Sequence, residues 1–174
     1  MSKLSLIASA AVFALSASTA NASDSRFFRN IVGQWSGPGE IVAGKFKGTK
    51  FVCTFDGSKP GKQDGMKIDG NCRVGVFSQP MNAIITKKGG AYSGKFLDGQ
   101  KGEGMDVTGA RYTNNRLVAS MIRHNLDGIT VVNLDDPNRM NVTISVKHGK
   151  NVIPVIGMNL VRKTDKIVTG SITQ

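Results

Sequence analysis

The chain contains few of the residues on which catalysis and metal binding usually depend. Its 174 residues include two cysteines, two histidines and one tryptophan. Two histidines leave little room for a Ser-His-Asp triad, and no Gly-x-Ser-x-Gly, His-Glu-x-x-His or phosphate-loop motif occurs. Cys53 and Cys72 are spaced as neither a Cys-x-x-Cys redox pair nor a zinc knuckle. We therefore expect a protein that is not an enzyme, with no catalytic residues, no cofactor and no metal.

The chain also lacks an apolar run that spans a bilayer comfortably, since a spanning helix needs roughly 20 residues. Its first 22 residues nonetheless have the layout of an export signal. Lys3 supplies a positive start, residues 4–15 form a short apolar stretch, and residues 20–22 form a small-x-small site. We expect cleavage after Ala22, which leaves residues 23–174 without a transmembrane segment, in the periplasm or outside the cell.

Acidic residues are scarce beside basic ones. The chain has 12 Asp+Glu against 23 Lys+Arg, a net charge of +11, and cleavage of the signal removes only Lys3 and leaves +10. A charge of this size attracts polyanions. Export separates the protein from nucleic acid, and its basic clusters lack the interleaved aromatic residues of a single-strand binding platform. An anionic component of the cell envelope is thus one expected partner, with a basic surface that has no dedicated partner as the alternative. The oligomeric state stays open.

An even number of cysteines in an oxidising compartment is typical of a disulfide. The only two cysteines, Cys53 and Cys72, are therefore expected to form one bridge. Both histidines, His124 and His148, lie far from these cysteines in the sequence, which argues against a shared metal site.

Helical periodicity is nearly absent, and residues 24–31 form the one expected helical turn. Runs rich in Val, Ile, Thr and Phe alternate with polar residues and are separated by glycine-rich turns, which is the pattern of short strands. The expected strands are residues 33–43, 49–55, 66–68, 72–78, 81–87, 91–97, 105–112, 116–124, 129–134, 141–147 and 152–162.

Strands of this length and spacing indicate an all-β sandwich or barrel. Turns between consecutive strands favour a single antiparallel up-and-down barrel of about eight strands, formed by residues 23–174 as one domain. Residues 113–115 (Thr-Asn-Asn) are suited to a turn with positive φ. Pro154 and Gly157 predict a bulge or bend in the last strand.

The first strand begins with Gly33-Gln34-Trp35, which resembles the Gly-x-Trp motif of the lipocalins and related calycin barrels. In that family the tryptophan closes one end of the barrel, and an arginine near the end of the last strand packs over the indole. The resemblance is one of architecture. It implies that Gly33, Trp35 and Arg162 close this barrel, with Arg162 in a cation–π contact on Trp35.

A barrel of this size is filled by its own side chains or holds one small ligand. Six methionines outside the signal offer an adaptable lining. The apolar residues expected to line or fill the interior are Phe46, Phe51, Phe55, Phe77, Phe96, Ile84, Val131 and Ile144.

These observations predict a non-enzymatic binding protein for a small apolar or amphipathic ligand or for an envelope component. One alternative is an inhibitor of a protease or lysozyme. Trp35 with the two cysteines resembles, in order, small periplasmic protease-inhibitor barrels, and residues 108–112 (Thr-Gly-Ala-Arg-Tyr) resemble a loop of periplasmic lysozyme inhibitors. A second alternative is a structural envelope protein that binds anionic surfaces through its positive charge.

Overall fold

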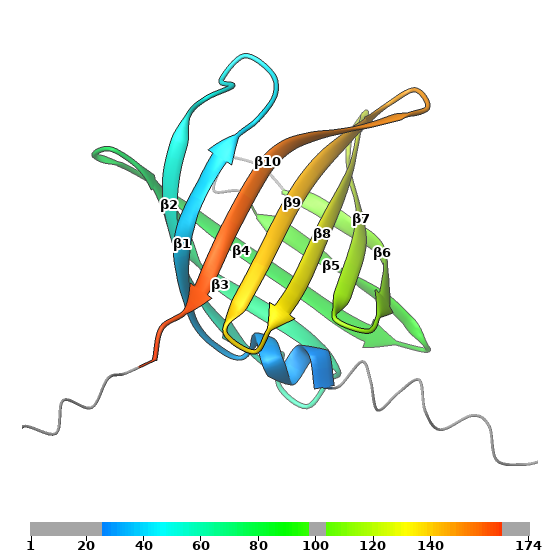
Figure 1. Ribbon diagram of the computed structural model, residues 1–174. Helices are drawn as coiled ribbons and strands as arrows, with labels where there is room; N and C mark the ends of the chain where they lie inside the picture. Colours follow the sequence, from blue (N-terminus) through cyan, green and yellow to red (C-terminus); the bar gives the residue numbers. More distant parts are fainter. Residues whose placement is uncertain (1–25, 98–103, 165–174) are drawn as a thin grey trace, which may run out of the picture.

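The computed structural model describes residues 26–97 and 104–164, which form a barrel of ten antiparallel strands (Figure 1). The predicted signal, residues 1–22, lies outside the described residues. A helix over residues 26–31 precedes the first strand. The strands are β1 Gly33–Ile41, β2 Lys50–Ser58, β3 Gly65–Val74, β4 Phe77–Lys88, β5 Ala91–Leu97, β6 Met105–Thr113, β7 Arg116–Arg123, β8 Leu126–Asp136, β9 Arg139–His148 and β10 Asn151–Arg162.

Each strand pairs with its neighbours in the sequence, and β1 closes the barrel against β10. The predicted all-β up-and-down barrel is therefore confirmed, with ten strands in place of about eight. In the closing register Trp35 lies opposite Arg162, and Gly39 lies opposite Met158. Closure gives every strand two hydrogen-bonded neighbours, which removes the free edges that an open sheet exposes.

Alternating side chains explain why these segments close around an apolar interior. Along β2, Cys53 and Phe55 are buried. Val52 belongs to the same strand and pairs with β1 and β3, but its side chain points to solvent. Along β7, Leu117 and Met121 are buried in the same period-two manner. Successive side chains of a strand point to opposite faces, so each strand contributes one row to the core.

Several breaks between strands differ from the prediction: the expected gap at residues 69–71 lies inside β3, and the β7–β8 turn lies at residues 124–125. The predicted strand over residues 72–78 is divided between β3 and β4 by a turn at Gly75 and Val76, with Val74 opposite Phe77. Gly75 has a φ of 57°, a conformation that glycine adopts without steric cost. Valine and phenylalanine favour strands, so the sequence around this turn looks like uninterrupted strand.

Pro80 fell between two predicted strands, but it lies inside β4, opposite Asn71 of β3. The described pairing of β4 with β5 begins only at Asn82, so Pro80 has a strand neighbour on one side. Proline lacks a backbone N–H and is tolerated where a strand has a free side. The β3–β4 hairpin thus extends beyond the part of β4 that pairs with β5.

Two local predictions are confirmed. The β6–β7 turn contains Asn114 with a φ of 52°, as expected for the Thr-Asn-Asn segment. The register of β10 against β9 shifts between Pro154 and Ile156, which is the predicted irregularity in the last strand.

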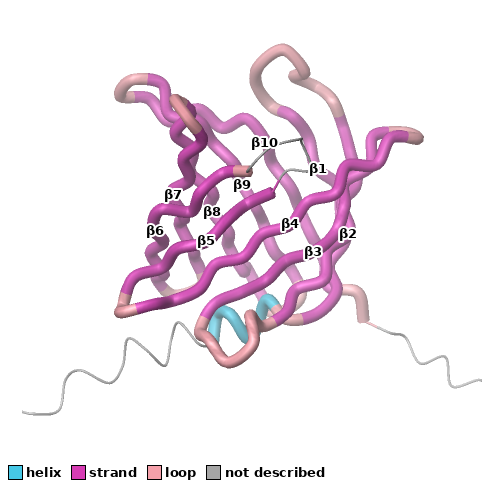
Figure 2. The backbone as a smooth tube through the Cα atoms, turned by 180° about the vertical axis from the view of Figure 1, so that it is seen from behind, coloured by secondary structure: helices cyan, strands magenta, loops and turns pink. Residues whose placement is uncertain are grey.

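The two ends of the barrel differ, as the views from both sides show (Figures 1 and 2). The helix over residues 26–31 lies at one end, which we call the helix end, and the β2–β3, β4–β5, β6–β7 and β8–β9 connections are at the same end. The opposite loop end carries the β1–β2, β3–β4, β7–β8 and β9–β10 connections. No helix in the described part of the chain has the length and apolar content that a membrane crossing requires.

Candidate functional site: the barrel interior

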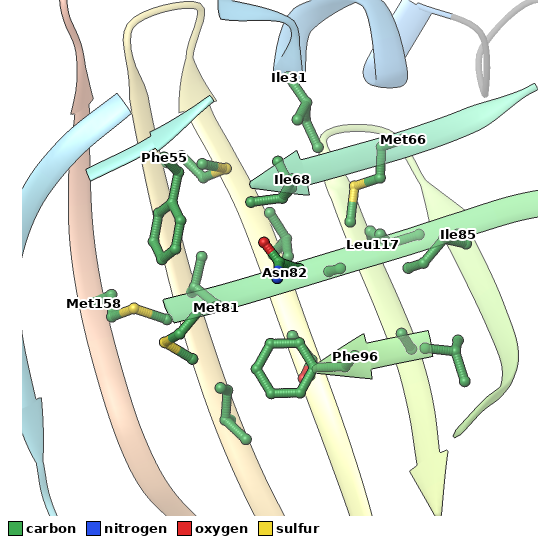
Figure 3. A pocket seen from close by; sticks show the side chains of 18 of the residues that line it. Ile31, Phe55, Met66, Ile68, Met81, Asn82, Ile85, Phe96, Leu117 and Met158 are labelled. Carbon is green, nitrogen blue, oxygen red and sulfur yellow. The ribbon is translucent and has the colours of Figure 1, made fainter. Parts of the chain in front are cut away.

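The interior of the barrel contains a cavity of about 90 Å³. Its walls come from every strand between β2 and β10 and from Ile31 of the helix (Figure 3). All but two of the lining residues, Asn82 and Thr130, are apolar. Every buried side-chain nitrogen and oxygen of the described residues has a hydrogen-bond partner. The cavity therefore offers apolar contact and no unsatisfied polar group.

Methionine is the most distinctive component of the wall. Five of the six methionines outside the predicted signal line the cavity: Met66, Met81, Met121, Met140 and Met158. Their unbranched, polarisable side chains adjust easily to an irregular occupant. The expected methionine-rich lining is therefore present in the cavity wall.

The structure places four of the expected lining residues in the interior. Phe55, Phe96 and Ile144 line the cavity. Phe51 is half-buried and packs against the same core. For these four residues the alternating pattern of the strand correctly predicted which side chains point inward.

The other four expected lining residues lie elsewhere, which corrects the prediction. Phe46 lies in the β1–β2 loop, and Phe77 begins β4 next to the turn; both are exposed. Ile84 is also exposed, because its neighbour Ile85 points inward. Val131 is absent from the cavity wall for the same reason, since Val132 beside it lines the cavity. Apolar character alone did not distinguish the inner from the outer side of β4 and β8.

Several lining residues were not selected from the sequence. They include Ile31, Leu117 and Ala119, together with the row Met81, Ala83 and Ile85 of β4. The signal that could have found the β4 row is its spacing of two, but isoleucine occupies both phases at residues 84 and 85. Ile31 needed knowledge of how the helix packs on the barrel.

The helix closes one end of the cavity with apolar side chains. Phe27, Phe28 and Ile31 are all buried. The Phe27 ring lies 5.0 Å from the Tyr112 ring of β6, and the Phe28 ring lies 5.5 Å from the Tyr92 ring of β5. Within the described residues, β5 pairs with β6 only over residues 94–96. The two phenylalanines thus pack where the barrel wall has its shortest ladder.

Trp35 joins the helix to the first strand. Its side chain is fully buried, and its indole Nε1 donates a hydrogen bond to the carbonyl oxygen of Ile31 at 2.8 Å. The carbonyls at a helix C-terminus have no partner within the helix. Trp35 therefore fills space at the helix end and also satisfies a group that the helix leaves open.

Arg162 fastens the same end from the last strand. Its guanidinium lies 4.3 Å from the centre of the Trp35 ring, a cation–π distance. It donates hydrogen bonds to the carbonyl oxygens of Asn30 and Val32 at 2.5 Å each and of Pro137 at 3.0 Å. The structure thus brings Trp35 and Arg162 together, and one side chain connects the helix, β1, β10 and the β8–β9 turn.

Gly33 makes room for this arrangement. Its φ is 125°, a backbone conformation that residues other than glycine rarely adopt. A Cβ at this position would lie 2.4 Å from Nη1 of Arg162. Gly33 is therefore the third member of the closure at the helix end.

Replacing Gly33 with alanine is expected to lower the free energy of unfolding by about 1–3 kcal/mol, the usual cost of such a backbone conformation. Displacement of Arg162 would add to this loss. Urea unfolding measures the change, with Gly157→Ala as the control, because a Cβ at Gly157 in β10 meets no atom within 4 Å. Equal stability of the two variants would show that the close approach of Gly33 and Arg162 carries no energetic weight.

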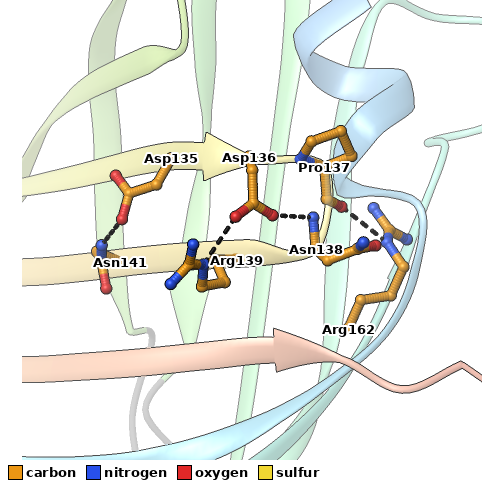
Figure 4. A network of polar contacts seen from close by, with 7 residues as sticks. All are labelled: Asp135, Asp136, Pro137, Asn138, Arg139, Asn141 and Arg162. Carbon is orange, nitrogen blue, oxygen red and sulfur yellow. Dashed lines mark hydrogen bonds and ion pairs between the residues drawn. The ribbon is translucent and has the colours of Figure 1, made fainter.

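A polar network orders the β8–β9 turn that receives Arg162 (Figure 4). Asp136 accepts hydrogen bonds from Nε of Arg139 and from the backbone N–H of Asn138, both at 2.7 Å. Asp135 accepts one from the side-chain amide of Asn141. These contacts hold the turn in the conformation that presents the Pro137 carbonyl to Arg162.

The hydrogen bond from Arg139 lowers the pKa of the Asp136 carboxyl, and the backbone N–H of Asn138 lowers it further. A carboxyl whose pKa is depressed by folding adds stability that is fully present above its unfolded pKa and is lost as the pH falls through the folded pKa. The hydrogen bonds that Asp136 accepts in this turn are therefore fully formed at neutral pH, and their contribution to stability is lost only in acid. Both side chains reach solvent, which screens the interaction.

The predicted disulfide between Cys53 and Cys72 is confirmed. The two residues lie opposite each other on β2 and β3, and both are buried. Their sulfurs contact two methionines of the cavity wall, with Met81 Sδ 3.2 Å from Cys72 and Met158 Sδ 3.7 Å from Cys53. The bridge thus fixes the wall beside the cavity. A disulfide is also compatible with an exported protein.

Comparison with known proteins supports the barrel. No protein-family model and no curated protein sequence matches the chain. Rv2717c from M. tuberculosis superposes with a TM-score of 0.56 and 11% identity, over 80% of this chain and 96% of that one. The S-type phycobiliprotein lyase CPES from Guillardia theta superposes with a TM-score of 0.55 and 15% identity, over 83% of this chain and 94% of that one. At such identities the likeness shows the fold alone, a barrel of calycin-like type.

Proposed function

We propose that the protein binds a small apolar ligand, or the apolar part of an amphipathic one, inside its barrel. The observation that carries this proposal is the cavity of about 90 Å³ with apolar walls in which no buried polar group lacks a partner. Apolar cavities of this kind stay dry and take up apolar molecules. An occupied cavity would regain the dispersion contacts that the empty walls lack.

The size of the cavity narrows the class of ligand. An apolar cavity of about 150 Å³ is known to accept benzene. A smaller cavity suits a slender group such as a short alkyl chain, and five methionine side chains allow the wall to widen around it. Because no buried polar side-chain atom of the described residues lacks a partner, we expect any polar head of an amphipathic ligand to remain outside the cavity.

The proposal is for binding without catalysis. Among the described residues, no group of three His, Cys, Asp or Glu is placed to hold a metal ion. The described cavity wall contains no titratable side chain that would serve as a general acid, a base or a nucleophile.

No observation favours the inhibitor alternative. An inhibitor of this kind could act through an N-terminal arm such as residues 23–29. Such an arm would need accessible side chains, but in its described part Phe27 and Phe28 are buried against the barrel. Residues 108–112 are part of β6, where they continue the barrel wall against β7 after a register shift between Val107 and Gly109.

The proposal predicts saturable binding of short 1-alkanols, which we would follow by NMR of ¹³C-methyl methionine. Titration with 1-butanol to 1-octanol should shift the methyl signals of Met66, Met81, Met121, Met140 and Met158 along one binding curve, because their side chains line the cavity. Met105 is buried outside the cavity wall and is the internal reference. If no alkanol of the series gives saturable shifts, the proposal is wrong.

A cavity-filling variant sharpens this test. Ala119→Leu extends a lining side chain into the cavity and should weaken alkanol binding at least about tenfold while keeping or raising the melting temperature, since filling a void restores packing. Ala91→Leu, at an exposed position of β5, is the matched control and should leave binding unchanged. Equal binding by both variants would place the alkanol outside the cavity.

A further inference from the structure

Exposed apolar side chains gather at the loop end of the barrel. Phe46 in the β1–β2 loop is 64% exposed, and Val76 and Phe77 at the β3–β4 turn are 87% and 78% exposed. Leu126 after the β7–β8 turn and Val152 after the β9–β10 turn are exposed as well. Each of these four hairpins therefore has at least one exposed apolar side chain. The four hairpins lie at the same end of the molecule (Figures 1 and 2).

The connections at the helix end are different. They consist of residues 59–64, 89–90, 114–115 and 137–138, with the sequences Lys-Pro-Gly-Lys-Gln-Asp, Gly-Gly, Asn-Asn and Pro-Asn. None of these described residues is an exposed large apolar side chain. Exposed valines at the helix end, Val32 and Val161, lie outside its hairpin turns, so among the described residues the apolar hairpin tips belong to the loop end. An exposed apolar cluster on one face usually marks an interaction surface.

Positive charge accompanies the apolar tips. Within residues 42–50, 73–80, 123–127 and 147–152, which form the four described loop-end hairpin tips, the sequence has seven Lys or Arg and a single acidic residue, Asp127. The β1–β2 hairpin tip, residues 42–50, carries Lys45, Lys47 and Lys50 without an acidic residue. Nζ of Lys45 lies 5.7 Å from the centre of the exposed Phe46 ring, so basic and apolar groups are adjacent.

This combination selects among possible occupants. A second copy of the chain would bring two positive ends together, which like-charge repulsion opposes. The apolar tips belong to four separate hairpins, each with basic residues beside it. Separate tips of this kind can each insert into a lipid interface, which adapts its shape around them. A bilayer with anionic head groups attracts the lysines and arginines and also accepts apolar side chains at the boundary of its acyl region.

We propose that the loop end of the barrel is a docking surface for an anionic lipid bilayer. Phe46, Val76 and Phe77 enter the interface, and Lys45, Lys47, Lys50, Arg73, Lys147 and Lys150 contact the head groups. The helix end, with Trp35 and Arg162, then points away from the bilayer. This docking does not depend on a ligand in the cavity, so its failure would leave the proposed ligand binding untouched.

The test is co-sedimentation of residues 23–174, the chain expected after cleavage, with large vesicles of phosphatidylcholine and phosphatidylglycerol at a ratio of 3:1, against vesicles of phosphatidylcholine alone. We expect binding to the anionic vesicles, little binding to the neutral ones, and a loss of binding as the ionic strength rises past about 0.15 M, where screening shortens electrostatic attraction. Absence of binding to the anionic vesicles at low salt overturns the proposal.

Paired variants decide whether the loop end is responsible. Val76→Ser/Phe77→Ser should weaken binding at least about tenfold, because two exposed apolar side chains no longer enter the interface. Its control, Val32→Ser/Val161→Ser, removes two exposed valines at the helix end and should leave binding unchanged.

A second pair of variants tests the lysines. Lys147→Gln/Lys150→Gln should weaken binding about fivefold or more. Lys59→Gln/Lys62→Gln, which removes the same charge from the helix end, should have a much smaller effect. Equal effects of the two lysine pairs would mean attraction by net charge alone and would overturn the proposed surface.

A fluorescent reporter tests the orientation directly. Trp35 is buried at the helix end, so its emission should not respond to vesicles. A tryptophan introduced by Phe77→Trp should shift its emission to shorter wavelength with anionic vesicles, and one introduced by Val161→Trp should not. A shift for Val161→Trp alone overturns the orientation. If the protein does not bind vesicles but sediments as a dimer, and Val76→Ser/Phe77→Ser makes it monomeric, the surface binds a second copy of the chain.

Discussion

Replacing Trp35 with alanine is expected to lower the free energy of unfolding by about 3–5 kcal/mol, the range for large aromatic side chains removed from a core. The indole is fully buried, it donates to the Ile31 carbonyl, and it supports Arg162. Its loss leaves a void where the helix, β1 and β10 meet. We therefore expect the helix to detach from the barrel before the strands unfold. Denaturant unfolding measures the loss, and amide hydrogen exchange of residues 26–31 reports the detachment.

Two comparisons make this prediction specific. Phe46→Ala removes an exposed aromatic side chain and should change stability by no more than about 0.5 kcal/mol. Trp35→Phe keeps most of the apolar volume but leaves the Ile31 carbonyl without its donor, at a cost of about 1–3 kcal/mol. A double-mutant cycle of Trp35→Phe with Arg162→Ala measures the coupling of the two side chains. A stability of Trp35→Ala equal to that of Phe46→Ala would refute the assigned role of the indole.

Removing the disulfide is the second change with a large expected effect. Cys53→Ala/Cys72→Ala should lower the free energy of unfolding by about 3 kcal/mol, because the bridge closes a loop with a sequence separation of 19 and restricts the unfolded chain. Reductant should lower the stability of the native chain by a similar amount and leave the variant unaffected. Unfolding curves with and without reductant provide the measurement.

The matched control for the disulfide is Val52→Ala/Arg73→Ala. These residues lie opposite each other one position along the same β2–β3 ladder, with side chains that point to solvent. Their replacement should have a much smaller effect, since exposed substitutions rarely exceed about 0.5 kcal/mol. If reductant leaves the native chain as stable as before, the bridge makes no contribution of the expected kind.

β2 shows how far local pattern alone can lead. Its alternation of Phe51, Cys53 and Phe55 predicted a strand with one inner face, and the structure places these three residues on that face. The hairpin turns predicted an up-and-down order, and the structure confirms it. Such features depend on neighbours within a few residues, and a period of two is a direct consequence of strand geometry.

β4 shows where local pattern fails. Met81, Ala83 and Ile85 point inward, but Ile84 between them is equally apolar, so composition does not determine the phase. The turn at Gly75 was hidden by Val76 and Phe77, which favour strands but are exposed at a hairpin tip. Exposure of such side chains follows from where the hairpin lies relative to the barrel. The loop-end surface could not be predicted from the sequence either, because its residues are spread over more than 100 positions and only the fold brings them to one end.

The class of fold, the order of the strands and the pairing of the only two cysteines follow from the order of residue types along the chain, because turns and alternation are local. The cavity does not follow from that order. It exists because the pleat of nine strands brings Met66, Met81, Met121, Met140 and Met158 to one interior, and because Phe27, Phe28 and Ile31 close one end. Packing between segments far apart in the chain decides which apolar side chains face one another, and neighbouring residues carry no information about that choice.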